Sequence, residues 1–194
     1  MSSHDPTVLP DDLPVPEDDG RARHLPGMRI PAVTLHATNG DVVRLDQIPG
    51  RTVVFAYPRT GRPGDVALIG EEEWNAIPGA RGCTPHACSF RDEHAAFEAR
   101  GVSVFGLSTQ DTEYQQEVAE RLHLPYPLLS DAELRLTRAL DLPVFEVAGT
   151  ILMKRLTLFL RDGAIEDVTY PVFPPDGAAA EALSRLEAAA PGGG

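Results

Sequence analysis

The stretch RTVVFAYP, residues 51–58, decides the fold that we expect for this chain. It is a continuous run of β-branched and aromatic residues that a proline ends, which is typical of a strand buried on both faces. Strands of this kind belong to sheets that helices cover on both sides. We therefore expect a central sheet built around residues 51–57.

The sequence on the carboxyl side of this strand alternates helices with strands. Residues 85–100 have apolar side chains at helical spacing and stop at Gly101, and residues 102–109 form a second apolar run. Beyond them we expect a helix, a short extended piece, a helix, a hairpin across Asp162-Gly163 and a last helix, over residues 111–124, 126–131, 132–142, 155–170 and 176–189. This order predicts an α/β fold, a thioredoxin-like sandwich with a central mixed β-sheet flanked by helices.

The 194-residue chain is expected to form one domain with a tail at each end. Residues 1–25 are acidic and proline-rich, which predicts a flexible leader, and residues 191–194 predict a short flexible tail. The domain between them, residues 26–190, contains a long Gly/Pro-punctuated loop with an inserted segment at 65–81. Loops of this length are uncommon in compact domains and favour a functional role.

The formal net charge of −12 excludes several classes of partner. Binding to nucleic acid or to an anionic membrane requires clustered Lys and Arg, so we expect neither partner. The first residues contain acids and prolines where a secretory signal has a basic start and an apolar run, and no run approaches the ~20 apolar residues of a membrane span. These features predict a cytoplasmic protein.

Both cysteines of the chain lie in GCTPHACSFRD, residues 82–92, five positions apart. In a reducing cytoplasm this pair is not expected to be a permanent disulfide, although two small buried thiols remain an alternative. A zinc site would need two more ligands, and His86 and His94 do not give the expected spacing with the cysteines. We expect redox chemistry with no metal and no cofactor.

Four segments together resemble the peroxiredoxin family, in its bacterioferritin-comigratory-protein or Q-type branch, over about residues 28–167: YPRTGRPG, GCTPHACSFRDEHAAFEARGVSVFGLST, YPLLSD and KRLTLFL. The resemblance implies a peroxidase that reduces hydrogen peroxide and alkyl hydroperoxides and that thioredoxin or a similar dithiol restores. It also implies that Cys83 is the peroxidatic thiol and Cys88 the resolving thiol, that Arg155 is the family's late arginine, and that the protein is a monomer.

Physical arguments support these roles. Thiolate attack cleaves a peroxide O–O bond, and Thr84-Pro85 after Cys83 predicts a helix N-cap followed by a first-turn proline, which would turn free amides toward the sulfur. Residues five positions apart on a helix are separated by a rise of ~7.5 Å, beyond the ~7 Å Cα separation that a disulfide allows. We therefore expect the helix to unwind before Cys88 reaches an oxidised Cys83.

The sequence departs from the family motif Pro-x-x-x-Thr/Ser-x-x-Cys. Counting from Pro58, the cysteine position holds Asp65 and the Thr position holds Arg62, because the inserted segment intervenes. We favour Thr60 as the pocket hydroxyl and expect Thr84 to cap the helix.

Several neighbouring side chains have open roles. The only tryptophan, Trp74, is expected to pack against the domain, with a place at the site entrance as the alternative. His86 is expected to be an exposed helix histidine, although it could tune the thiols. Tyr57 is either core or in reach of the site, and Arg91 either acts on the thiolate or lies on a solvated face.

Two other functions compete with a peroxidase. A thiol-disulfide oxidoreductase would act on protein disulfides, but the chain has no Cys-x-x-Cys pair. A redox-sensing module would form the disulfide once without turnover.

Overall fold

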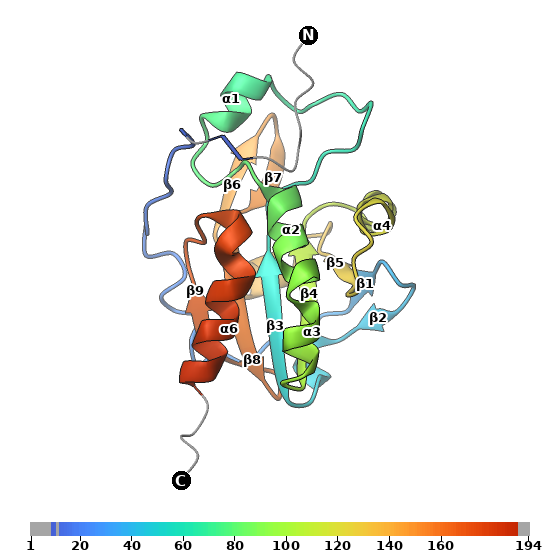
Figure 1. The fold of residues 1–194 in the computed structure, drawn as a ribbon, viewed down its shortest axis with the longest axis vertical. Helices are drawn as coiled ribbons and strands as arrows, with labels where there is room; N and C mark the ends of the chain where they lie inside the picture. Colours follow the sequence, from blue (N-terminus) through green and yellow to red (C-terminus); the bar gives the residue numbers. More distant parts are fainter. Residues whose placement is uncertain (1–8, 11, 190–194) are drawn as a thin grey trace.

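The computed structural model describes residues 9–10 and 12–189. Within this part, one sheet has seven strands in the order β2-β1-β5-β4-β3-β8-β9 (Figure 1). Their bounds are β1 (Leu35–Ala37), β2 (Val42–Val43), β3 (Arg51–Ala56), β4 (Val102–Ser108), β5 (Leu128–Ser130), β8 (Leu156–Arg161) and β9 (Ala164–Thr169). β3, β4 and β5 are parallel, whereas β8 and β9 add antiparallel pairs on one side and β1 and β2 on the other.

Helices cover both faces of this sheet. The described elements are α1 (Glu71–Asn75), α2 (Cys83–Asp92), α3 (His94–Glu98), α4 (Thr112–Arg121), α5 (Arg135–Ala139), α6 (Ala178–Ala188) and the 3-10 turns η1 (Leu45–Gln47) and η2 (Pro175–Gly177). In Figure 1, α2, α3 and α6 lie in front of the sheet. The expected thioredoxin-like α/β sandwich is confirmed.

The strand β3 has the buried character that its sequence predicts. Its side chains alternate between two apolar cores, with Val53 and Phe55 facing α2, α3, α4 and α6, and Val54 and Ala56 facing α5 and the segment around Leu25. Because β3 lies between β4 and β8, both of its edges are also paired. The strand therefore fixes the position of α2, whose residues pack on one of these cores.

Some local expectations needed correction. The helix expected over 85–100 is two helices, because Glu93 (φ −96°, ψ 3°) separates α2 from α3. A second hairpin, β6 (Val144–Val147) with β7 (Thr150–Met153), was not expected at all. The inserted segment 65–81, expected as a loop, contains the short helix α1.

The expected leader packs on the domain over part of its length. Leu25 is fully buried, and Asp19 accepts hydrogen bonds from Lys154 Nζ at 2.7 Å and from the Tyr170 hydroxyl at 2.8 Å. The packed part of the chain thus begins before residue 26. Residues 1–8, 11 and the expected tail at 191–194 lie outside the described residues.

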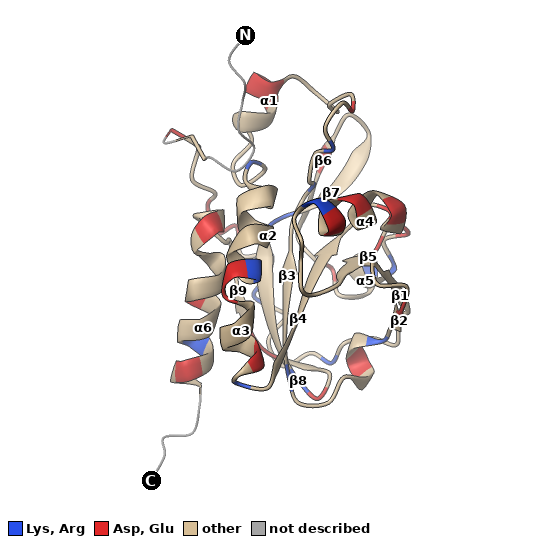
Figure 2. Cartoon of the chain, turned by 45° about the vertical axis from the view of Figure 1, so that its right-hand side comes forward, with Lys and Arg blue, Asp and Glu red and all other residues tan. Residues whose placement is uncertain are grey.

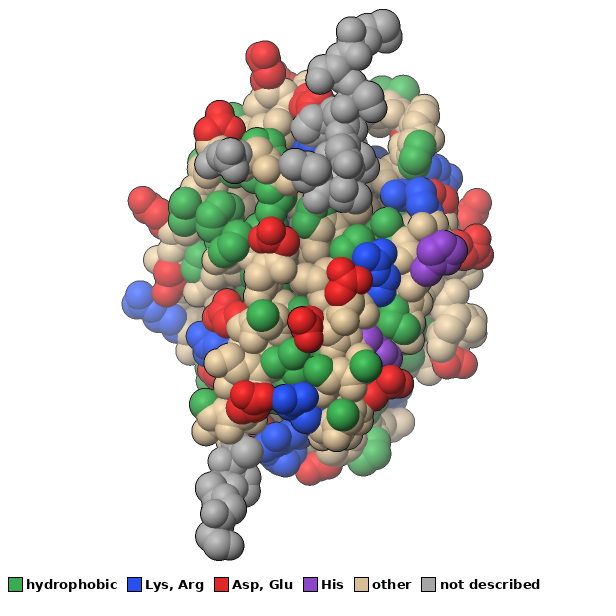
Figure 3. Space-filling view, in the orientation of Figure 1, with side chains coloured by type: hydrophobic (Ala, Val, Ile, Leu, Met, Phe, Trp, Pro, Cys, Tyr) green, Lys and Arg blue, Asp and Glu red, His purple; other side chains and the backbone are tan. Residues whose placement is uncertain are grey.

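Charged side chains are mixed over the surface. Figure 2 shows acidic and basic residues on several helices and loops, with only acidic ones on α1, and on the face drawn in Figure 3 basic side chains lie among acidic ones. Among the described residues, no helix combines the length and apolar character that crossing a membrane requires.

Candidate active site

Helix α2 begins at Cys83 itself. Gly82 is its N-cap, with φ at +99°, and the first helical hydrogen bond runs from the amide of His86 to the carbonyl of Gly82 at 2.9 Å. The expectation of Thr84 as N-cap and Pro85 as first helical residue was therefore wrong by two positions. Glycine is required at 82, because a Cβ there would lie 2.5 Å from Cγ of Pro175.

Arg155 contacts the sulfur of Cys83, although the two residues are 72 positions apart in the sequence. Its Nη2 lies 3.4 Å from Cys83 Sγ, and only 3% of the Arg155 surface is exposed. Arg155 directly precedes β8, the neighbour of β3 in the sheet, so the sheet fixes its position. The guanidinium can therefore donate a hydrogen bond to the sulfur and stabilise negative charge that develops there during a reaction.

The same guanidinium also binds the chain that leads into α2. Its Nη2 donates to three successive carbonyl oxygens, those of Gly79, Ala80 and Arg81, at 3.3, 3.5 and 3.1 Å. The thiol of Cys83 donates to one of these carbonyls, that of Ala80, at 3.6 Å. Arg155 thus holds the end of the inserted segment and the reactive thiol in one cluster.

His86 is the remaining partner of Arg155, and its expected exposure was wrong. The ring is fully buried and lies tilted against the rings of Phe55 and Phe90, with centroid distances of 4.8 and 5.6 Å. Its Nδ1 accepts from Arg155 Nη1 at 2.6 Å, so a neutral ring carries its proton on Nε2. Burial, followed by the charge of Arg155, holds the pKa of His86 well below its usual value.

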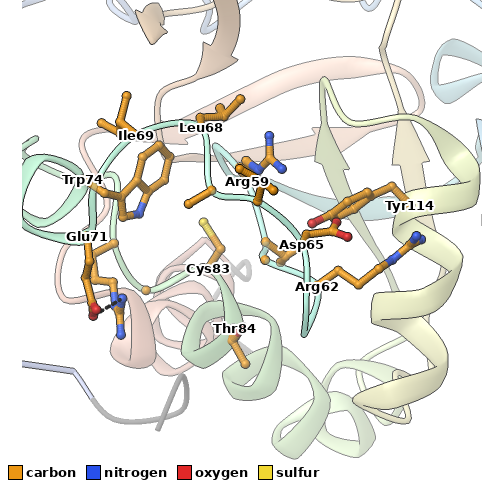
Figure 4. A pocket seen from close by; sticks show the side chains of 16 residues that line it. Arg59, Arg62, Asp65, Leu68, Ile69, Glu71, Trp74, Cys83, Thr84 and Tyr114 are labelled. Carbon is orange, nitrogen blue, oxygen red and sulfur yellow. Dashed lines mark ion pairs between the residues drawn. The ribbon is translucent and has the colours of Figure 1, made fainter. Parts of the chain in front are cut away.

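Cys83 opens into a pocket of about 320 Å³. In Figure 4 its sulfur points into this pocket, between Trp74 on one side and Arg59 on the other. Only 5% of the Cys83 surface is exposed, so the pocket is the route by which a small molecule would reach the sulfur. Trp74 packs against the domain, as expected, through its contact with the Phe145 ring, and it also lines this pocket.

Thr60, Thr84 and Arg62 line the same pocket, whereas Pro58 is not among its lining residues. The Thr60 hydroxyl and amide both donate to Oε1 of Gln110, at 3.1 and 2.9 Å, so its oxygen still has lone pairs free to accept. Pro58 is buried behind it, with its carbonyl accepting from the Ser108 hydroxyl at 3.1 Å. The structure thus brings Arg155 into contact with Cys83, places Thr60 in the lining of the same pocket, and leaves Pro58 outside that lining.

Cys88 has different surroundings on the same helix. It is half-buried against the apolar core, and burial raises the pKa of its thiol, with Asp92 adding to the rise while Arg91 and Arg121 oppose it. Both cysteines are free thiols. Since both lie within the intact α2, they are held apart by more than one helical turn.

Two side chains with open roles can now be placed. Tyr57 is core: its surface is 1% exposed, its hydroxyl accepts from Gln115 Nε2, and burial raises its pKa. Arg91 acts near Cys88 rather than Cys83, and its Nη1 donates to the carbonyl of Leu122.

Three polar contacts of the site were not predicted from the sequence: His86 with Arg155, Gln110 with Thr60, and the Tyr126 hydroxyl with the carbonyl of Ala87 at 2.6 Å. The partners in each pair are 39 to 69 positions apart in the sequence. Only the position of Gln110 just after a buried strand gave a signal, because strand ends of a parallel sheet meet at one edge.

The described part of the chain contains no cluster of side chains that could bind a metal ion. Among residues 9–10 and 12–189, no three His, Cys, Asp or Glu side chains gather closely enough to hold a metal ion.

Comparisons with known proteins show which family the chain resembles. A family model described as Redoxin matches residues 25–186. Peroxiredoxin Q of Oryza sativa subsp. japonica, a chloroplastic protein, is 27% identical over 187 residues, covering 93% of this chain and 77% of that protein. A bcp-type peroxiredoxin of Coxiella burnetii is 27% identical over 172 residues, covering 82% of this chain and 97% of that protein.

A solved structure extends the likeness to three dimensions. Peroxidoxin BcpB of Mycobacterium tuberculosis superposes with a TM-score of 0.67 at 28% identity, covering 84% of this chain and 97% of that one. The family resemblance seen in the sequence is confirmed. This chain belongs to the redoxin family and, within it, to the bacterioferritin-comigratory-protein or Q-type peroxiredoxins, which are peroxidase oxidoreductases.

Proposed function

We propose that this peroxiredoxin reduces hydroperoxides by a two-cysteine cycle within one chain, with Cys83 as the attacking thiol and Cys88 as the resolving thiol. One observation carries the proposal: the Cys83 sulfur lies 3.4 Å from the buried guanidinium of Arg155 and points into an open pocket. No other cysteine of the chain has a cation at this distance among the described residues.

In the first step, the Cys83 thiolate attacks one oxygen of the hydroperoxide and the O–O bond breaks. A sulfenic acid forms on Cys83, and the other oxygen leaves as an alcohol, or as water from hydrogen peroxide, after it takes up a proton. Arg155 favours this step because its N–H groups stabilise the anionic sulfur and the negative charge that develops on the leaving oxygen. Thr60 accepts a hydrogen bond from the hydroperoxide, for which its oxygen has a free lone pair.

In the second step, the Cys88 sulfur attacks the sulfenic acid, a disulfide forms and water leaves. The intact α2 prevents this contact, so its first turns must unwind first. A dithiol then attacks the disulfide by thiol–disulfide exchange. The dithiol is oxidised to a disulfide, and both cysteines of this chain return to thiols.

Thioredoxin or a similar small dithiol protein is our candidate for this reductant. We also place the protein in the cytoplasm and expect a monomer. The bacterial bcp-type relative supports the compartment, whereas the plant relatives are named as chloroplastic. The monomer is supported by the site, to which one chain supplies Cys83, Cys88 and Arg155.

The cycle is tested by mass spectrometry after one equivalent of peroxide, combined with a thioredoxin, thioredoxin reductase and NADPH assay. We expect loss of two hydrogens, a peptide linkage between Cys83 and Cys88, and sustained NADPH oxidation. Two free thiols with no consumption of peroxide would overturn the proposal. Linkage without turnover would indicate a sensor, and turnover only with disulfide substrates would indicate a thiol-disulfide oxidoreductase.

A further inference from the structure

The inserted segment 65–81 supplies one wall of the pocket above Cys83. Its lining side chains there are largely apolar: Val66, Ala67, Leu68, Ile69 and Trp74. In Figure 4, Trp74, Ile69 and Leu68 lie on the side of the pocket toward which the Cys83 sulfur points. A molecule that places its O–O bond at the sulfur therefore extends its other end along this wall.

Trp74 is positioned by a contact with the ring of Phe145. Its ring lies 6.5 Å, centroid to centroid, from the ring of Phe145 on β6, and the residue is only half-buried. One part of the indole thus packs on the domain, while another part faces the pocket. A large aromatic surface fixed in this way is suited to bind a hydrocarbon group.

The pocket is larger than hydrogen peroxide requires. Its volume of about 320 Å³ lies in the range of small-molecule sites, ~300–1,000 Å³, whereas one water occupies ~30 Å³. Hydrogen peroxide would leave most of the apolar wall in contact with water, but an organic hydroperoxide would cover it.

The charged residues of the pocket do not favour an anionic substrate. Arg81 pairs with Glu71 at 3.6 Å, and Arg62 pairs with Glu117 at 3.9 Å while its guanidinium lies over the Tyr114 ring. Arg59, the third arginine of the lining, lies over the Tyr114 ring at 5.5 Å, and Asp65 adds a carboxylate that offsets its charge. The complementary substrate is uncharged.

We propose that Trp74 is a specificity-determining residue, and that the wall formed by the inserted segment selects uncharged hydroperoxides with an aromatic or branched hydrocarbon body over hydrogen peroxide. The inference rests on the proposed function, because it assigns the substrate class of that same site. Trp74 contacts the body of the substrate and takes no part in cleaving the O–O bond.

The test compares kcat/KM for cumene hydroperoxide and for hydrogen peroxide in the wild type and in Trp74→Ala. We expect the value for cumene hydroperoxide to fall about tenfold or more, since loss of a few apolar contacts in a pocket costs ~10–200-fold. The value for hydrogen peroxide should change less than about twofold. Trp74→Phe, which keeps an aromatic surface, should restore most of the ratio.

Glu72→Ala is the matched control, because Glu72 lies on α1 beside Trp74 and is not part of the pocket lining. It should leave the ratio unchanged. An equal fall for both peroxides in Trp74→Ala would show that Trp74 only supports the fold of the site, and a ratio that does not change would likewise overturn the inference.

A binding measurement separates this inference from the peroxidase cycle. Trp74 is the only tryptophan, so its fluorescence in the unreactive Cys83→Ser variant reports contact with the wall. We expect saturable quenching or a shift of emission with cumene hydroperoxide and with its alcohol product, and none with hydrogen peroxide at the same concentration. Binding without peroxidase activity in the wild type would refute the cycle alone, whereas activity without a preference for cumene hydroperoxide and without a fluorescence response would refute the wall alone.

Discussion

The two ends of α2 place the same side chain in opposite surroundings. At its first residue, Cys83 lies against the buried cation of Arg155 and opens into the pocket. Five positions on, Cys88 packs against the apolar core, and burial raises the pKa of its thiol. The difference supports the two roles that we propose, attack by the first sulfur and resolution by the second after the helix opens.

Removal of each thiol in turn should have the largest effect on the difference between the Cys83 and Cys88 ends of α2. Cys83→Ser should reduce peroxide consumption to the uncatalysed rate, because no second nucleophile faces the pocket. Cys88→Ser should still consume one peroxide per chain but lose recycling by thioredoxin. Stopped-flow and steady-state peroxide assays distinguish the two outcomes, and a Cys88→Ser enzyme with full thioredoxin-linked turnover would contradict the roles given to the two ends.

A pair of arginine substitutions sharpens the comparison. Arg155→Met should slow the reaction of Cys83 with peroxide by ~10²–10³-fold, the usual effect of removing one hydrogen-bond donor from a site of developing charge. Arg91→Met, near Cys88 instead, should change this rate little. Competition for peroxide against a second peroxidase measures both rates, and circular dichroism checks that the variants are folded. Equal losses of rate in the two variants would show that Arg155 has no particular effect on Cys83.

The pH dependence of α2 should depend on His86. Its pKa is held well below the usual value in the packed helix, whereas an opened helix would return it to ~6.5. The opened state therefore binds more protons below pH ~6.5, and the stability of the packed helix, present above that pH, is lost as the pH falls, by up to about tenfold per unit in the opening equilibrium. The charge that faces the ring is that of Arg155.

Amide hydrogen exchange of α2 between pH 5 and 8 measures this effect, after correction for the intrinsic exchange rate. His86→Gln keeps an acceptor for Arg155 but has no titrating group, so it should flatten the dependence. A wild-type profile that matches that of His86→Gln would show that His86 has no part in the opening.

The smallest effect concerns the middle of the helix, between the two thiols. Tyr126→Phe removes the hydrogen bond from its hydroxyl to the carbonyl of Ala87, which is worth ~1 kcal/mol. Opening of α2 should become about fivefold more frequent, as measured by alkylation of Cys88 in the Cys83→Ser background. Tyr57→Phe is the control, since its hydroxyl is hydrogen-bonded to Gln115 rather than to the backbone of α2, and it should leave the alkylation rate unchanged.

Local sequence patterns predicted most of the fold. The run ending at Pro58 is a fully paired central strand, and Asp162-Gly163 forms the expected hairpin turn with φ at 50° and 74°. The hairpin of β6 and β7 escaped notice because its turn is Ala148-Gly149, which has no strong turn signature, and because its strands have only four residues each.

The site was predictable where a residue's role depends on its own neighbours in the sequence. The spacing of Cys83 and Cys88 alone predicts that an intact helix separates them. The surroundings of His86 were not predictable, because its burial depends on Phe55 and Arg155, which come from other elements. The cap was misplaced because Gly82 accepts a left-handed conformation that packs on Pro175, a contact between distant parts of the chain.

The guanidinium of Arg155 holds the three carbonyls that end the inserted segment as well as the sulfur. Oxidation of the sulfur would leave these carbonyls unchanged. We therefore expect the hinge to lie at Gly82, with the helix turning about it while residues 79–81 stay anchored. A catalyst built in this way would keep its substrate wall assembled through the whole redox cycle, so that each reduced enzyme is ready for its next peroxide as soon as one short helix rewinds.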